Sequence, residues 1–110
     1  MILRALTSEM TDRVAFRLNH LRFVPEESGC YALASIDEIV LYVGKTTNLH
    51  RRLEDHLSDP EKTGITPSGR AVWFYYGFWP EERIEHVEMQ LLRDHKMVEG
   101  VWPILNKTGP

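Results

Sequence analysis

One stretch, from Gly29 to His56, constrains the fold of this chain most, because its residue pattern changes from that of strands to that of a helix. Residues 29–35 and 38–43 are rich in strand formers, and a short polar turn near Ile36 and Asp37 separates them. The stretch therefore predicts an antiparallel hairpin that is followed closely by a helix.

Two tyrosines, Tyr31 and Tyr42, fall on the two strands of this hairpin. A two-residue turn sets Tyr31 opposite Tyr42, whereas a turn longer by two residues sets Tyr31 opposite Gly44. Both registers place the two tyrosines on one face of the sheet, because side-chain direction alternates along a strand. Tyrosine is also a common packing residue in strands, so a packing role and a functional role are both open.

Residues 44–47 form the predicted exit turn of the hairpin, and Thr47 or Asn48 can cap the helix after it. Two neighbouring stripes run along that helix: Leu49, Leu53 and Leu57 face the core, and Asn48, Arg52 and His56 lie beside them. The polar stripe is compatible with a solvated face as well as with a functional site.

The segments on either side of this unit are less regular. Residues 8–22 predict an amphipathic helix, capped by Ser8 or Thr11, whose apolar face packs on the domain or contacts a second copy. That apolar face consists of Val14, Leu18 and Leu21. Residues 58–69, rich in proline, glycine and threonine, predict a loop that is either a flap over a substrate or a simple connection.

The last third of the chain predicts a buried strand and a long helix. Residues 70–79 are almost continuously apolar and aromatic, which is typical of a central strand. The helix runs from Pro80 to Glu99 and ends at Gly100. Its predicted buried arc consists of Ile84, Val87, Leu91, Leu92 and Val98. Glu88 falls inside this arc, where a carboxylate is costly unless it is paired or binds a cation, so both uses are open.

Composition bounds the class of protein. A length of 110 residues with 43% hydrophobic and 26% charged residues fits one globular domain. The single cysteine, Cys30, excludes an internal disulfide and favours a reducing compartment, which we take to be the cytoplasm. No leader or long apolar run is apparent, so we expect no secretion and no membrane insertion. The net charge of −3 argues against an indiscriminate nucleic-acid coat protein.

Several short patterns occur in a defined order along the chain. They are Gly29-Cys30-Tyr31, then Tyr42-Val43-Gly44, then Arg52 and His56 on a helix, then Glu88-Met89-Gln90-Leu91-Leu92, then Pro103 and Asn106. Together they resemble the motifs of the GIY-YIG nucleases over roughly residues 29–106. Cysteine replaces the middle isoleucine of the first motif, and we expect this apolar packing position to tolerate the change.

The resemblance implies an α+β fold with α/β/α layers, built on a small three-stranded antiparallel sheet flanked by helices. It implies a nuclease-like domain over residues 29–110, with residues 1–28 as an N-terminal helical extension packed on it. The two parts would make one compact domain.

The resemblance also implies metal-dependent hydrolysis of DNA phosphodiester bonds. Tyr31 would be the general base, and a nearby cation, for which Lys45 is the candidate, would lower the pKa of its phenol. Arg52 would hold the scissile phosphate. Glu88 would be the sole protein ligand of Mg²⁺ or Mn²⁺. Tyr42 and His56 would position water or phosphate.

The remaining residues would support the site. Asn106 would hold it in place through hydrogen bonds, and the expected substrate contacts are Gly44, Lys45, Asn48 and Arg52. The expected partners are DNA, including branched or otherwise structured forms, and a protein that supplies specificity; a homodimer is also open. The alternative function is a catalytically weak or inactive module of the same fold that binds nucleic acid or a protein.

Overall fold

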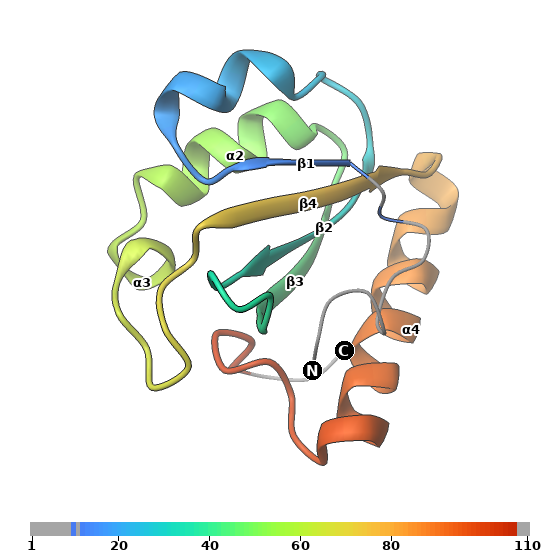
Figure 1. The fold of residues 1–110 in the computed structure, drawn as a ribbon. Helices are drawn as coiled ribbons and strands as arrows, with labels where there is room; N and C mark the ends of the chain where they lie inside the picture. The colour runs from blue at the N-terminus through green and yellow to red at the C-terminus, as the bar shows by residue number, and fades with distance from the viewer. Residues whose placement is uncertain (1–9, 11, 108–110) are drawn as a thin grey trace.

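The structure, a computed structural model, describes Met10 and residues 12–107. An antiparallel sheet forms its centre, and helices lie on both sides of it (Figure 1). In chain order the elements are β1 (Asp12–Ala15), the 3-10 helix η1 (Leu18–Phe23), β2 (Gly29–Ala34), β3 (Val40–Thr46), α2 (Leu49–Leu57), α3 (Pro60–Thr63), β4 (Trp73–Phe78) and α4 (Glu81–Glu99). The predicted α+β fold class is confirmed.

The sheet contains four strands in the order β1-β4-β2-β3, and each neighbouring pair is antiparallel. Three of them, β2, β3 and β4, are the strands that the sequence predicts, and β4 is an inner strand, as its apolar pattern indicates. The additional strand is β1, which pairs with β4 so that Val14 lies opposite Phe74. The two edge strands of the sheet are therefore β1, beside β4, and β3, beside β2.

The helix predicted over residues 8–22 is wrong within the described part of the chain. Strand β1 and the short helix η1 occupy most of that range, and Leu18, expected on a buried face, is 70% exposed. Pairing with the edge of β4 outweighs the weak helical preference of this segment. The helical surface considered for a homodimer is therefore absent there. The proposed caps Ser8 and Thr11 lie outside the described residues.

The hairpin adopts the longer of its two predicted turns. Tyr31 lies opposite Gly44 and Leu33 opposite Tyr42, so both tyrosines share one face of the sheet. The exit turn predicted at residues 44–47 is wrong, because β3 continues to Thr46, which pairs with β2. Gly44 has no positive φ, so its role is not to turn the chain.

Each face of the sheet has its own hydrophobic core. On one face Cys30 and Ala32 pack with residues of α4, and on the other Tyr31 and Leu33 pack with residues of α2. This alternation follows from the opposite directions of successive side chains in β2. The result is the predicted α/β/α layering, with α2 and α4 separated by the sheet (Figure 1).

Helix α4 buries Ile84, Val87, Leu91 and Leu92, as predicted. The prediction for Val98 is wrong, since this side chain is 63% exposed and His95 is buried instead. Gly100, with φ of 79°, turns the chain back so that the carbonyl oxygen of Val101 lies 2.7 Å from Nδ1 of His95. No helix in the described ranges is long and apolar enough to cross a membrane.

The loop predicted over residues 58–69 contains the one-turn helix α3. Asp59 caps it by accepting a hydrogen bond from the Glu61 amide, and Pro60 occupies its first turn. The segment after α4 runs beside β3, where the Leu105 amide donates to the Leu41 carbonyl.

Candidate active site

The hydroxyl of Tyr31 forms the centre of the site. Tyr31 is 1% exposed, its ring stacks on Phe74, and its hydroxyl oxygen lies 2.7 Å from Nε2 of His56. His56 comes from the polar stripe of α2 and is itself buried, so this stripe is not a solvated face. The ring of Tyr42 completes the group, with its centroid 5.4 Å from that of His56.

Burial sets the protonation of this pair. Burial raises the pKa of the Tyr31 phenol well above its ordinary value, and the neighbouring Tyr42 raises it further. The pKa of His56 is lowered to about 4, first by burial and then by the charges of Lys62 and Arg52. At neutral pH the site therefore holds a protonated phenol beside a neutral imidazole.

The prediction that Lys45 lowers the pKa of the Tyr31 phenol is wrong. The cation that acts in this direction is Arg52, and its effect is smaller than that of burial. Lys45 lies opposite Cys30, on the face of the sheet that carries α4, so its side chain points away from the phenol.

Gly44 provides space for the phenol. A β-carbon at this position would overlap the hydroxyl oxygen and ring carbons of Tyr31. The absence of a side chain at Gly44 therefore lets the Tyr31 ring lie over β3, the outer strand of the sheet. A direct substrate contact by Gly44 stays a prediction.

Glu88 reaches the same outer strand from the opposite face. Its carboxylate oxygen Oε1 lies 3.3 Å from the Lys45 ammonium, and the Glu88 side chain is 17% exposed. Its charge contributes to the raised pKa of Tyr31, so the two residues interact across the edge of the sheet. The pairing considered for Glu88 therefore exists, as a salt bridge with Lys45.

The residues around Glu88 fit a divalent cation only as a one-carboxylate site. No group of three or more His, Cys, Asp or Glu side chains that could hold a metal occurs in the described residues. A carboxylate oxygen is nevertheless the hard ligand that Mg²⁺ and Mn²⁺ prefer, and Mg²⁺ commonly keeps several waters. A cation at Glu88 would compete with Lys45 for the same oxygen.

Arg52 has an unused donor in this site. Its Nε is buried and has no hydrogen-bond partner among the described residues. Leaving a buried N–H of a charged group unpaired is unfavourable, and a phosphate oxygen would satisfy it. The guanidinium acts on both Tyr31 and His56, so an anion bound to it would lie beside the phenol.

The two asparagines have structural contacts. Asn48 caps α2 by accepting a hydrogen bond from the Arg51 amide, as one of the predicted caps. Asn106 accepts from the Val43 amide and donates to the Val43 carbonyl, each over 2.9 Å. Asn106 thereby fixes the strand next to Gly44, and its role in catalysis stays a prediction, as does substrate contact by Asn48.

Lys62 is a member of the site that the sequence interpretation missed. It lies on α3, with its ammonium 4.7 Å from the centroid of the Tyr42 ring and 3.7 Å from Asp59 Oδ2. The signal was present in the chain, since Asp59-Pro60 is a typical helix start and places Lys62 in the first turn.

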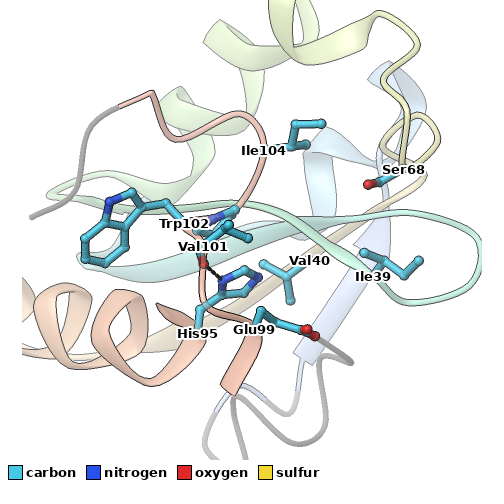
Figure 2. A pocket seen from close by; sticks show the side chains of 9 residues that line it. Ile39, Val40, Ser68, His95, Glu99, Val101, Trp102 and Ile104 are labelled. Carbon is cyan, nitrogen blue, oxygen red and sulfur yellow. Dashed lines mark hydrogen bonds between the residues drawn. The ribbon is translucent and has the colours of Figure 1, made fainter. Parts of the chain in front are cut away.

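A separate cavity of about 420 Å³ lies at the far end of α4 (Figure 2). Its lining comprises Ile39, Val40, Ser68, His95, Glu99, Val101, Trp102, Pro103 and Ile104. It includes none of the predicted site residues, so the candidate chemistry lies elsewhere.

The chain matches the family model of the GIY-YIG catalytic domain over residues 27–99. Among curated proteins it is 26% identical over 91 residues to UvrABC system protein C of Methanosarcina acetivorans, covering 78% of this chain and 16% of the relative. It is 56% identical over 36 residues to the protein of that name from Aromatoleum aromaticum, covering 33% and 6%. The chain thus spans a small part of these relatives.

Solved structures match the fold over most of the chain. The GIY-YIG N-terminal endonuclease domain of UvrC from Thermotoga maritima, as a point mutant bound to its catalytic divalent cation, is similar with a TM-score of 0.61 and 18% identity. That match covers 82% of this chain and 93% of the other. A second point mutant of the same domain matches with a TM-score of 0.58, 18% identity and the same coverage.

Proposed function

This chain belongs to the GIY-YIG catalytic-domain family, and from that premise we propose that it is a metal-dependent DNA endonuclease that hydrolyses phosphodiester bonds. The observation that carries the proposal is the buried pair of the Tyr31 hydroxyl and His56 Nε2, 2.7 Å apart. Near this pair the Nε of Arg52 is buried and finds no hydrogen-bond partner in the described part of the chain. Hydrolysis needs a base for water and positive charge for the phosphorane-like transition state, and these groups supply both.

Tyr31 acts as the general base in this proposal. Its phenol accepts a proton from the attacking water while it passes its own proton to Nε2 of His56. The neutral state of His56 supports the proposal, because an imidazolium could not accept that proton. The transfer leaves a protonated phenol and an imidazolium, so the proton removed from water stays in the site.

Arg52 binds the scissile phosphate, and this binding changes the pKa of His56, which accepts the proton from Tyr31. The charges of Lys62 and Arg52 help to keep the pKa of His56 low. A phosphate anion beside Arg52 offsets these charges and raises the pKa of His56 when the substrate arrives. The base therefore becomes stronger in the complex with DNA than in the free protein.

Glu88 holds the divalent cation, Mg²⁺ or Mn²⁺, with Tyr42 and Asn106 as supporting residues of the site. When bound, the cation would supply charge neutralisation at the phosphate and the leaving oxygen. The solved relatives are described as bound to a catalytic divalent cation, which supports a metal in this family. The relatives' common name, a system protein, supports a protein partner that directs the nuclease to its substrate.

A module that binds DNA without cutting it is the second candidate. The observation that favours it is the ion pair between Lys45 and Glu88, which occupies the carboxylate that the metal needs. Activity and binding must therefore be measured separately.

A panel of supercoiled, linear, flapped and branched DNA, with Mg²⁺ or Mn²⁺, tests the proposal. We expect cleavage by the parent, and none by Glu88→Ala. Glu85→Ala, an exposed glutamate on the same helix, is the matched control and should cut like the parent. If no substrate is cut but DNA is bound, the second candidate replaces the first.

The phosphate contact has its own control pair. Arg52→Ala should weaken both DNA binding and cleavage, whereas Arg51→Ala removes an exposed arginine of the same helix turn and should change them little. Equal rates for the Arg52 variant and the parent would remove Arg52 from the site.

A further inference from the structure

The side chain of Lys62 is enclosed to an unusual degree for a lysine. It is only 12% exposed, although lysine is among the residues least often buried. The four residues of α3 hold it in place, with Asp59 as the cap and Gly64 ending the helix. This single turn thus delivers one cation to the group formed by Tyr31, Tyr42 and His56, which come from β2, β3 and α2.

The Lys62 ammonium has N–H donors that are available to a further acceptor. Its ion pair with Asp59 spans 3.7 Å, and no hydrogen bond from the ammonium is found in the described part of the chain. An ammonium carries three N–H donors, so it can bind an additional acceptor without breaking an existing hydrogen bond. The ammonium lies over the Tyr42 ring and is therefore close to the group formed by Tyr31, Tyr42 and His56.

Lys62 and Arg52 approach His56 from different helices. Both charges lower the pKa of His56, while Asp59 and Asp55 oppose them. Lys107, by contrast, pairs with Glu61 on the exposed side of the same helix α3, 2.9 Å away. The two lysines near α3 therefore differ in direction: Lys62 is turned inward and Lys107 outward.

We propose that Lys62 is a second phosphate-binding cation, which together with Arg52 grips the DNA backbone at the active site. This inference rests on the proposed endonuclease function and extends it to a residue outside the sequence motifs. Asp59 keeps the ammonium in position while no DNA is bound, and the phosphate then supplies the hydrogen-bond acceptors that Asp59 does not. Helix α3 is in this way part of the substrate-binding surface.

DNA binding at several salt concentrations, with EDTA present so that the DNA is not cut, tests the contact. Lys62→Met keeps an unbranched side chain, shorter by one heavy atom, and removes the charge. Because each phosphate contact contributes about 0.9 to the slope of log K against log salt, the slope should fall by about 0.9 in this variant. Lys62→Arg should restore it, and Lys107→Met should leave it unchanged.

A second readout needs no DNA. In the free protein, NMR titration of the His56 ring should give a higher pKa in Lys62→Met than in the parent, and no change in Lys107→Met. A parent-like slope in Lys62→Met, alongside a reduced slope in Arg52→Ala, would overturn the phosphate contact. An unchanged His56 pKa would overturn the placement of the ammonium.

The two proposals fail in different ways. If the parent cuts DNA and the slope does not depend on Lys62, the endonuclease function stands and the inference is wrong. If DNA binding depends on Lys62 but no DNA is cut, the inference stands and the endonuclease function is wrong. A parent that neither binds nor cuts DNA would overturn both.

Discussion

Gly44 lies directly beneath the hydroxyl of Tyr31, so close that a β-carbon would occupy the space of the phenol oxygen. Gly44→Ala should therefore displace the Tyr31 ring, at a cost of about 1–3 kcal/mol from overpacking. We expect a lower denaturation midpoint in urea and a loss of cleavage. Parent-like stability together with parent-like cleavage would show that β3 can move away without harm to the site.

Removal of the Tyr31 hydroxyl should abolish cleavage without unfolding the protein. Tyr31→Phe leaves Nε2 of His56 without its partner, which costs about 1–3 kcal/mol for a buried polar group. The matched control is Tyr76→Phe, since Tyr76 lies opposite Tyr31 on β4 and its hydroxyl makes no hydrogen bond with a described residue. Gel assays of both variants decide whether the effect belongs to Tyr31.

Stability should fall in acid because His56 is buried in its neutral form. Its folded pKa of about 4 lies below the ordinary value of 6.5, so the unfolded chain binds the proton more readily. The contribution of neutral His56 to the free energy of unfolding is fully present above pH 6.5. It declines as the pH falls toward 4, with a slope of at most about 1.4 kcal/mol per pH unit. His95 acts in the same direction.

His56→Gln isolates the share that belongs to His56. Urea unfolding at intervals between pH 4 and 7.5 should give a flatter pH dependence for this variant than for the parent. Curves of identical slope would mean that His56 does not change its protonation on unfolding in this range.

Lys45 should compete with a divalent cation for Glu88. Lys45→Met removes the competitor, and since a partly exposed ion pair is worth about 0–1 kcal/mol, cation binding should tighten by up to about fivefold. Glu88→Gln should abolish it. Mn²⁺ titration followed by electron paramagnetic resonance measures both, and equal affinity in the parent and Lys45→Met would contradict the competition.

Asn106 should be important for stability as well as for activity. Asn106→Ala removes two hydrogen bonds to Val43 and should cost about 1–3 kcal/mol, or a fall in Tm of several degrees. Asn106→Asp keeps the acceptor and loses the donor, so an intermediate effect is expected. Thermal unfolding against Asn19→Ala, an exposed asparagine, measures the difference.

Local patterns predicted the core of the fold well. The hairpin, α2, β4 and α4 have strong periodicity or clear caps, and their side-chain directions follow from parity and helical spacing. Periodicity also placed Glu88 in the buried arc and His56 beside the leucine stripe, whereas their roles followed from the resemblance to the GIY-YIG nucleases and stay predictions. The shared face of Tyr31 and Tyr42 needed only the alternation of a strand.

The errors concern interactions between distant segments. Strand β1 exists because β4 offers an edge, and nothing within residues 12–15 indicates that partner. The ion pair of Lys45 could not be foreseen either, because it depends on Gly44 and Lys45 staying in the strand rather than turning. Lys62 was missed since a four-residue helix is too short to show periodicity.

The segment that follows α4 has a consequence beyond catalysis. The outer strand of a sheet carries free N–H and C=O groups that can recruit a strand from another molecule, which leads to aggregation. In β3 the Leu41 carbonyl accepts from the Leu105 amide, and both backbone groups of Val43 are bonded to Asn106. The segment after α4 therefore engages part of the outer edge of β3, and Asn106 leaves fewer free backbone groups there for a strand of another molecule to pair with.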